Sequence, residues 1–276
     1  MLVVIKGAGD LATGVAVRLR HAGVSVVMTD LARPTAVRRT VSFCEAIAHG
    51  EATVEDVRAL RAENAQAARA IAARGLVAVL IDPDATCVAA LAPDVLVDAI
   101  LAKRNTGTRM TDAPLVLALG PGFVAGRDCH AVIETMRGHD LGRVYWVGSA
   151  IPNTGVPGEV GGASAERLLR APCDGVFCAL RAIGDTVAPG DVLASVAGVP
   201  IRARIPGTLR GLLADGLVVH TGMKAGDIDP RAVPAHCYTV SDKARSLGGA
   251  VLEAIATARA RARGNEEAGG TGRRED

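Results

Sequence analysis

Aromatic side chains are scarce in this sequence: three Phe, two Tyr and one Trp make up 2% of the 276 residues. Proteins that bind single-stranded nucleic acids stack bases on aromatic platforms, and this chain could build few of them. The formal net charge is only +2, so bulk electrostatics do not favour a polyanionic partner either. We therefore expect no nucleic acid among the partners.

Leader, membrane-span and metal-binding patterns are also missing. The first residues, MLVVIKG, lack a basic leader and a cleavage site. No apolar run approaches the roughly 18 residues that a membrane span needs. The six cysteines are scattered, with no CxxC spacing and no neighbouring histidine cluster, which favours reduced core thiols over disulfides or a zinc site. These patterns predict a cytoplasmic location, no membrane contact and no metal site.

The sequence is instead rich in small and aliphatic residues. Hydrophobic residues make up 49%, charged residues 22%, and there are 32 glycines. The length predicts two domains, and the composition predicts a core of Val, Leu, Ile and Ala. Such packing suits parallel sheets and glycine-rich turns.

Residues 1–150 alternate short apolar runs with helical patterns, which predicts a Rossmann-like, doubly wound parallel α/β domain that binds a ligand. The predicted strands are 2–6, 24–29, 76–81, 95–100, 115–119 and 143–147. The predicted helices are about 10–22, 35–48, 54–74, 84–92 and 128–138.

Residues 151–170 have loop chemistry and are predicted to link this domain to a second one over 171–240. The second domain contains an internal repeat: Gly175 and Gly207 each begin a unit with Leu, Gly, Val and Gly at offsets 5, 9, 12 and 15. Two such units predict a small, quasi-two-fold β sandwich. An Ala/Arg-rich helix is expected over 241–263, and the polar tail 264–276 is expected to be disordered.

The pattern around 184–193 (GDTVAPGDVL) resembles the biotinyl/lipoyl-like barrel-sandwich hybrid. Carrier domains of that type hold a lysine at a hairpin tip, where this chain has Ala197 to Pro200. The second domain is therefore expected to share the carrier fold without the lysine that carries biotin or lipoate.

The turn after the first strand matches the dinucleotide fingerprint G-x-G-x-x-A. Its glycines would let backbone N–H groups approach a phosphate at the start of a helix. Asp30, at the end of the second strand, could accept hydrogen bonds from ribose hydroxyls. The acidic Asp10 is awkward beside a phosphate, and the segment could be only a tight turn with Asp10 as its cap. The candidate residues here are Gly7, Gly9, Asp10, Ala12, Thr13 and Asp30.

Two further loops follow predicted strands, at the edge where open α/β sheets bind ligands. Lys103, Arg104 and Asn105 form a cationic, donor-rich segment suited to a phosphate or pterin phosphate. Gly120 and Gly122 flank a proline in an irregular, close-approach loop. A solvated loop and a simple turn remain the alternatives.

No catalytic residue is assigned. His130 and Glu134 are expected to pair at helical spacing, which explains them without catalysis. Cys87 follows a predicted strand on the crevice side, but neighbouring carboxylates would raise its pKa and make it a weak nucleophile.

Six segments, in this order, resemble the selenium-dependent molybdenum hydroxylase maturation proteins, which are related to the xanthine dehydrogenase accessory factors. They cover most of the chain up to Arg231. The segments are GAGDLATGVAVRL (7–19), RRTVSFCEAI (38–47), DAILAKRNTGT (98–108), LALGPGFVAGRDCHAVIETMRGHDLGRV (117–144), NTGVPGEVGG (153–162) and GMKAGDIDPR (222–231).

This resemblance implies a maturation factor that handles the molybdenum cofactor, molybdopterin, or its selenium ligand. The implied partners are a molybdenum hydroxylase apoprotein and a selenium- or sulfur-transfer protein, and self-association into a homo-oligomer stays open. Two alternatives remain: an NAD(P)-dependent oxidoreductase, and a docking protein with a vestigial nucleotide site.

Overall fold

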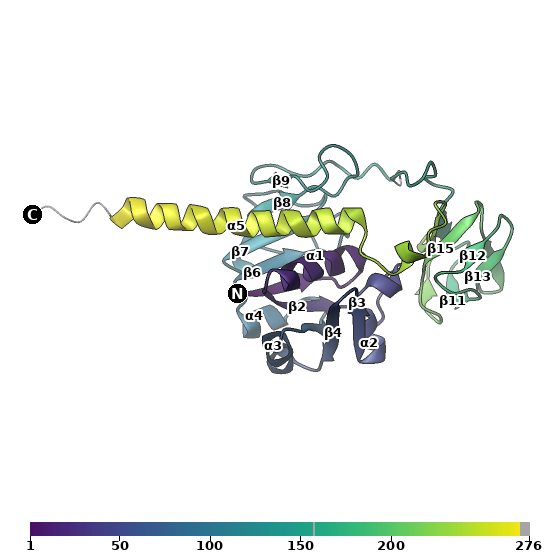
Figure 1. The fold of residues 1–276 in the computed structure, drawn as a ribbon, viewed down its shortest axis with the longest axis horizontal. Coiled ribbons are helices and arrows are strands. Elements are labelled where there is room, and N and C mark those ends of the chain that lie inside the picture. Colours follow the sequence, from purple (N-terminus) through teal and green to yellow (C-terminus); the bar gives the residue numbers. More distant parts are fainter. Residues whose placement is uncertain (157, 271–276) are drawn as a thin grey trace, which may run out of the picture.

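A nine-stranded sheet forms the centre of the N-terminal part of the computed structural model, which describes residues 1–156 and 158–270 (Figure 1). Its order is β3-β4-β5-β2-β1-β6-β7-β8-β9. The strands from β4 to β8 are parallel, and β3 and β9 add antiparallel edges. The strands are β1 (Leu2–Lys6), β2 (Ser25–Asp30), β3 (Glu51–Val54), β4 (Val57–Ala62), β5 (Val77–Ile81), β6 (Val95–Asp98), β7 (Leu115–Leu119), β8 (Ala131–Ile133) and β9 (Val144–Tyr145).

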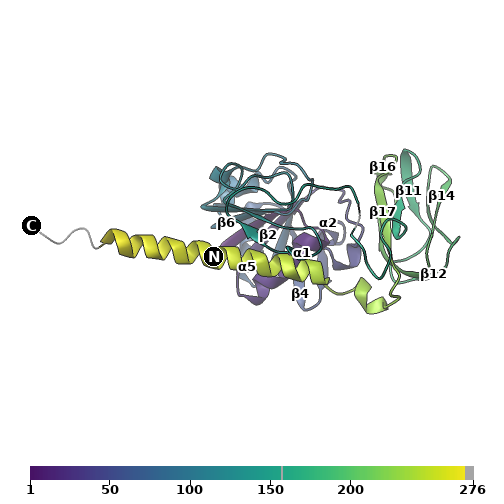
Figure 2. The same ribbon diagram turned by 90° about the horizontal axis from the view of Figure 1, so that it is seen from above.

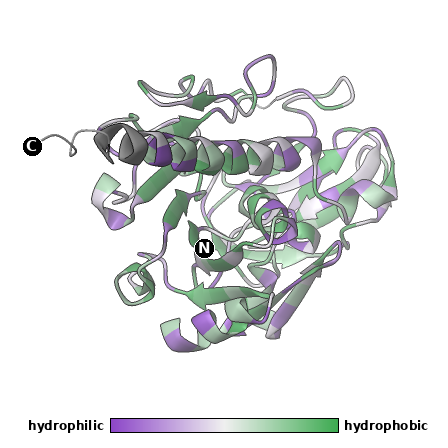
Figure 3. Cartoon of the chain, turned by 60° about the vertical axis from the view of Figure 1, so that its left-hand side comes forward, coloured by the Kyte–Doolittle hydropathy of each residue, from purple (hydrophilic) through white to green (hydrophobic). Residues whose placement is uncertain are grey.

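Helices cover both faces of this sheet. Helices α1 (Asp10–His21) and α5 (Asp242–Gly270) pack together over one face, and α3 (Ala65–Ala73) and α4 (Cys87–Leu91) pack over the other. The buried strands are almost wholly aliphatic, and they are the predominantly green elements under the helices in Figure 3. The low aromatic content is thus matched by a core of short, branched side chains, as the composition predicted.

Close contact between α1 and α5 sets the direction of both helices. A Cβ on Gly14 would lie 2.5 Å from Cβ of Ala244, and one on Gly248 would lie 2.8 Å from the carbonyl oxygen of Gly14. Because Gly248 also lies against Arg18, the two helices run parallel. Their N-termini therefore point toward the same end of the sheet.

Several predicted helices are wrong. Residues 54–74 form the end of a β-hairpin and then α3: burial alternates over 57–60, the first four residues of β4, and Glu55 adopts a left-handed turn conformation. The Ala/Arg-rich composition concealed this alternation. Residues 128–138 contain β8 rather than a helix, and 35–48 hold only a 3₁₀ turn (Arg39–Val41) and the start of α2 (Glu45–His49).

Two four-stranded antiparallel sheets enclose a separate core around Phe177 and Leu193 (Figure 2). Their orders are β10-β17-β15-β12 and β14-β13-β11-β16. A shift of 32 residues carries each strand of one sheet onto its equivalent in the other, so the repeat seen in the sequence is visible in the strand order. The strands are β10 (Leu168–Arg170), β11 (Gly175–Ala179), β12 (Thr186–Val187), β13 (Val192–Val196), β14 (Val199–Arg202), β15 (Gly207–Leu212), β16 (Val218–Val219) and β17 (Lys224–Asp229).

The expected fold class, a Rossmann-like doubly wound parallel sheet followed by a biotinyl/lipoyl-like barrel-sandwich hybrid, is corrected by these observations. The molecule is a mixed α/β protein: antiparallel strands close both edges of the large sheet, and hairpins or loops replace several of the crossover helices. Strand β10 lies inside the predicted linker, so the β-sheet unit begins by Leu168. Two short 3₁₀ segments, Met110–Asp112 and Pro234–Cys237, complete the described elements. Helix α5 continues to Gly270, beyond the predicted end at 263, and residues 271–276 of the expected tail lie outside the described residues.

Candidate functional site: a cationic cleft between the sheets

The N-termini of α1 and α5 open into a cleft between the large sheet and the sheet that contains β17. The cleft consists of two neighbouring cavities of about 680 and 620 Å³. Asp10, Leu11, Val37, Leu101 and Lys224 line both cavities. The cleft therefore collects side chains from the carboxyl-terminal edge of the large sheet, from α5 and from the β-sheet unit.

The glycine turn after β1 forms one wall of the smaller cavity. Gly7 has a φ of +94°, and a Cβ there would lie 3.0 Å from the carbonyl oxygen of Ala99. Gly9 precedes α1 without a side-chain cap, so the first N–H groups of the helix face this cavity unpaired by any capping side chain. The glycine at position 7 is therefore required by this tight turn, and its predicted role in binding stays a prediction.

Asp30 secures the turn and also lines the smaller cavity. Its carboxylate accepts hydrogen bonds from the N–H groups of Ala8 (2.8 Å) and Leu31 (2.7 Å). Burial raises the pKa of Asp30 despite these two bonds. Each carboxylate oxygen retains a second lone pair, so a hydroxyl in the cavity could still donate to Asp30.

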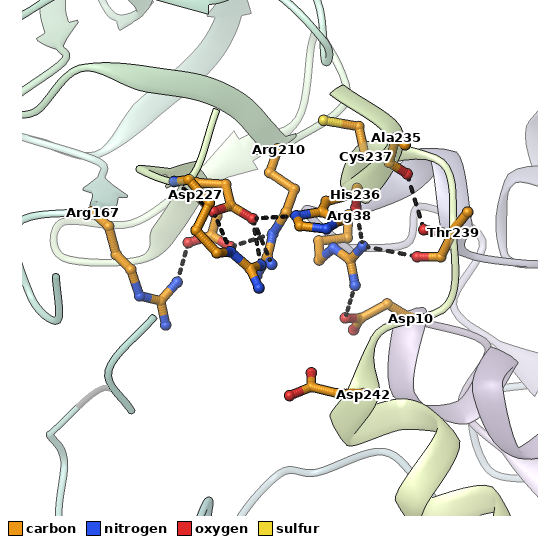
Figure 4. A network of polar contacts seen from close by, with 12 residues as sticks. Asp10, Arg38, Arg167, Arg210, Asp227, Ala235, His236, Cys237, Thr239 and Asp242 are labelled. Atoms are coloured by element: carbon orange, nitrogen blue, oxygen red, sulfur yellow. Dashed lines mark hydrogen bonds and ion pairs between the residues drawn. The ribbon is translucent and has the colours of Figure 1, made fainter. Parts of the chain in front are cut away.

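Asp10 does not cap α1 but turns toward Arg38, with 3.4 Å between the carboxylate and Nη1 (Figure 4). The buried Arg38 also donates to the carbonyl oxygens of His236 (2.9 Å) and Thr239 (3.3 Å). Burial lowers the pKa of Arg38, and Asp10 opposes this effect. The negative charge of Asp10, which is unfavourable for an anion at this turn, is therefore balanced by the buried guanidinium group of Arg38.

A second ionic network lies on the cleft side of β17. Asp227 pairs with Arg167 and accepts from Arg210, with 2.8 Å to Nη2 and 3.2 Å to Nε (Figure 4). Arg210 also reaches Asp229 at 3.2 Å. Burial alone would raise the pKa of Asp229, but hydrogen bonds from Arg231 and the charge of Arg210 hold that pKa at about 2. These arginines are therefore committed to carboxylates.

Seven basic and three acidic side chains line the larger cavity. The four arginines all form ion pairs: Arg38 with Asp10, Arg137 with Asp242, and Arg167 and Arg210 with Asp227. The three lysines, Lys103, Lys224 and Lys243, form neither an ion pair nor a side-chain hydrogen bond within the described part of the chain.

The lysines have different surroundings. Lys103 extends from an exposed loop, while the walls of the cleft desolvate Lys224 and lower its pKa even though its side chain reaches solvent. Desolvation also lowers the pKa of Lys243, and the nearby charges of Arg137 and Lys224 lower it further. The larger cavity therefore holds three lysine amines that pair with no described carboxylate, in a partly desolvated space where basic side chains outnumber acidic ones.

Among the predicted residues, Ala12 lines the smaller cavity, but Thr13 does not. The buried Thr13 hydroxyl donates to the carbonyl oxygen of Ala8 (3.2 Å) and accepts from the N–H of Phe43 (2.9 Å). Asn105 likewise fastens its own loop by bonding to Gly107 and Thr108. Thr13 and Asn105 thus shape the turns that surround the cleft.

The predicted loops after β6 and β7 are in contact. A Cβ on Gly122 would lie 2.5 Å from the backbone nitrogen of Arg104, and one on Gly120 would lie 2.7 Å from Oγ1 of Thr135. Both glycines have positive φ and allow close packing instead of lining a cavity. Lys103 lines the larger cavity, whereas the exposed Arg104 lines neither cavity.

His130 and Cys87 lie outside both cavities. The predicted helical pairing of His130 with Glu134 is wrong, because the segment between them is strand β8. His130 accepts the Val116 N–H at 2.9 Å through Nδ1, and the buried Glu134 accepts the N–H groups of Met136 and Ile151, each at 2.7 Å. Burial, followed by the hydrogen bond and charge of Asp82, raises the pKa of Cys87 to about 12, so this thiol is a weak nucleophile.

Sequence reasoning missed the basic residues supplied by the β-sheet unit and by α5. Charged residues within otherwise apolar strands were the available signal, at Arg210 in β15 and at Lys224 and Asp227 in β17. Across the described residues, no group of three or more His, Cys, Asp or Glu side chains is placed to hold a metal ion. No described helix is both long and apolar enough to cross a membrane.

Among known proteins, an uncharacterised protein of Escherichia coli (strain K12), YqeB, is 51% identical to this chain over 254 residues. The match covers 92% of this chain and 47% of YqeB, so the chain spans about half the length of that relative. No protein-family model matches.

Three solved structures show weak likeness. An aspartoacylase family protein from Mesorhizobium loti has a TM-score of 0.26 and 13% identity over 82% of this chain and 83% of its own. A succinylglutamate desuccinylase/aspartoacylase from Rhodobacter sphaeroides has a TM-score of 0.24 and 14% identity, covering 81% and 86%. The product-bound ectoine utilization protein EutE (DoeB) from Ruegeria pomeroyi has a TM-score of 0.22 and 21% identity, covering 30% and 27%. Similarity at this level does not carry an activity over to this chain.

These comparisons contradict the predicted family. The matched relative is named only as an uncharacterised protein, not as a maturation protein of molybdenum hydroxylases. The predicted maturation function is therefore wrong as well, and neither the oxidoreductase nor the docking alternative gains support from these matches.

Proposed function

We propose that the cleft binds a small organic anion that carries a phosphate or several carboxylates. The observation that carries this proposal is the contrast between the cations of the larger cavity: its arginines are paired with carboxylates and its three lysines are not. Unpaired cations gathered in a concave, partly desolvated space favour an anionic ligand, because the ligand supplies the missing negative charge.

The smaller cavity would hold the part of the ligand next to the anion. The start of α1 presents backbone N–H groups there, and Asp30 offers acceptors to hydroxyl groups. Both cofactors predicted from the sequence, NAD(P) and molybdopterin, combine phosphate with hydroxyl or ring groups of this kind. They remain predictions, and the proposal commits only to the anionic class.

Calorimetric titration of the full chain with inorganic pyrophosphate, NAD⁺ and NADP⁺ tests this function. Lys103→Ala should weaken pyrophosphate binding by about tenfold, as expected for a lost charge-assisted contact. Arg104→Ala is the matched control: it removes the same charge from the next residue, which lines neither cavity, so affinity should stay within about twofold. Equal effects of the two substitutions, or no binding of any of the three anions, would refute the proposed site.

The predicted cytoplasmic location belongs to the same proposal. Fractionation of cells that express the chain at its natural level, followed by immunoblotting, would test it; recovery of the chain outside the cytoplasmic fraction would contradict it.

A further inference from the structure

Lysine is used very selectively in this chain. The sequence has 31 lysines and arginines together, of which only Lys6, Lys103, Lys224 and Lys243 are lysines. Three of these four line the larger cavity. Lys6 is buried beside Asp98 and Thr108, 2.9 Å from the hydroxyl of Thr108. All the other residues of these two types are arginines, so the cleft is where the chain concentrates its side-chain primary amines.

Lys243 lies where an ammonium ion is least favoured. It is the second residue of α5, which begins at Asp242 after Ser241, whose Oγ accepts the Ala244 N–H at 3.2 Å. The positive end of a helix dipole disfavours a cation in the first turn. The side chain also lines the larger cavity, so it is directed into the proposed ligand space.

The groups that face Lys243 come from every element around it. Arg137, after β8, and Lys224, on β17, are cations; Asp10, on α1, and Glu134, after β8, are carboxylates. Each nearby carboxylate has other partners: Asp10 pairs with Arg38, and Glu134 accepts two backbone N–H groups. On α5 itself, Asp242 is held by Arg137 through bonds of 2.7 and 3.0 Å. No described carboxylate is therefore free to neutralise the amine at close range.

We propose that the ε-amino group of Lys243 is a nucleophile that forms an imine with an aldehyde or ketone carried by the anionic ligand. This inference rests on the proposed function, because the anion would be held by Lys103 and Lys224 while its carbonyl group meets Lys243. An amine that is neutral, desolvated and beside another cation is the form of lysine that attacks carbonyl groups.

The reaction balances without an oxidant or a reductant. The nitrogen lone pair attacks the carbonyl carbon, and the C=O π electrons move to oxygen. The two protons of the neutral amine pass to that oxygen, which leaves as water while the C=N bond forms. When the imine nitrogen takes up one proton from solvent, it withdraws electrons from the adjacent carbon of the ligand, which is the chemical purpose of such an adduct.

Reductive trapping provides the test, because the chain has few amines to compete. The full chain is incubated with pyridoxal 5′-phosphate, reduced with sodium borohydride, digested and analysed by mass spectrometry. Lys243 lines the cavity that would hold the phosphate, and desolvation lowers the pKa of its amine, so Lys243 should be labelled severalfold faster than Lys103. Inorganic pyrophosphate should suppress the Lys243 adduct, and pyridoxal, which lacks the phosphate, should show a smaller preference for Lys243. Equal labelling by pyridoxal 5′-phosphate would overturn the inference.

Three variants separate charge from nucleophilicity. Lys243→Arg removes the amine that can form an imine, so it should lose the Lys243 adduct while Lys103 is still labelled by pyridoxal 5′-phosphate. Lys224→Met removes a neighbouring cation, which should raise the pKa of Lys243 and move the midpoint of labelling to higher pH; Lys224→Arg should leave the midpoint in place. An unmoved midpoint in Lys224→Met would contradict the assigned role of Lys224.

The proposed function and this inference fail in different ways. Absence of pyrophosphate binding by the unmodified chain would refute the anion site itself. Pyrophosphate binding without a preferred adduct at Lys243 would leave the anion site standing and refute the imine chemistry alone.

Discussion

The two halves of the β-sheet repeat have the same strand order, but the outer face of one carries charged side chains and the outer face of the other carries uncharged ones. Positions 32 residues apart are equivalent, and in the sheet that faces the cleft they hold Arg167, Arg210 and Asp227. In the other sheet the same positions hold Val199, Cys178 and Ser195.

The ionic face is covered by the N-terminal part of the chain, and the weakly polar face is exposed, including Val199 and Val218. In this unit the charged outer face is therefore the buried one, and the more apolar outer face is the exposed one. A sheet face can carry charge inside the molecule when carboxylates and guanidinium groups satisfy one another, and the duplicated fold tolerates either face because its common core lies between the sheets.

The two halves should differ most in how much free energy of unfolding is lost when one side chain at an equivalent position is replaced. Asp227→Asn would leave Arg167 buried without a carboxylate and Arg210 with Asp229 alone, which costs about 3–5 kcal/mol of unfolding free energy. Ser195→Ala, at the equivalent position, should change that free energy by less than about 0.5 kcal/mol. Urea unfolding followed by circular dichroism measures both; similar values would remove the energetic distinction between the two faces.

Substitutions at two equivalent glycines should differ less in their effect on the free energy of unfolding. Gly207 and Gly175 begin their units with φ of +154° and +152°. In Gly207→Ala the new Cβ would overlap the backbone carbonyl of Asp229, whereas in Gly175→Ala it would meet the side chain of Ala197 at 3.1 Å. We expect losses of about 3 kcal/mol and about 1 kcal/mol, because both positions are strained but only one also meets backbone. Thermal unfolding at matched concentrations tests the order, and the reverse order would be inconsistent with this packing.

The carboxylates of the sheet that faces the cleft should also make the free energy of unfolding depend on pH. The folded-state pKa of Asp229 is about 2, below its ordinary value of 3.8, so its contribution is complete above about pH 4 and is lost as pH falls toward 2. The shift corresponds to about 2 kcal/mol. Its equivalent, Ala197, has no such group. Urea unfolding between pH 5 and pH 2 should show a shallower pH dependence in Asp229→Asn than in the unmodified chain; parallel profiles would contradict this assignment.

Local sequence patterns located much of the large sheet. Strand β7 begins and ends where predicted, and β1, β2 and β5 agree within a residue, because a strand buried on both faces must be an unbroken apolar run. The start of α5 and its apolar side, including Leu247, Val251 and Ile255, also follow from periodicity. The β3–β4 hairpin was missed because its alternating pattern consists of Ala, Arg and Leu, which also favour helices.

The candidate site was only half visible in the sequence. The Gly7–Ala12 turn and Asp30 line the smaller cavity, because local geometry sets the position of a glycine turn between a strand and a helix; their role in binding stays a prediction. Lys224 and Lys243 belong to segments more than 200 residues further along, and no local signal relates them to that turn. The predicted family is also wrong, because the ordered resemblance over short segments does not agree with the relative that matches 92% of this chain, which is named only as an uncharacterised protein.

The sequence by itself determined the aliphatic core, the glycine turn after β1, the duplication of the β-sheet unit and the scarcity of lysine. These depend on residue type and spacing, which act over a few turns of chain. Only the tertiary structure decided which face of the duplicated unit lies against the cleft and that three of four lysines meet there. The physical reason is that α1 and α5 pack in parallel through Gly14 and Gly248, a contact between distant segments that directs both helix N-termini into one positively charged space.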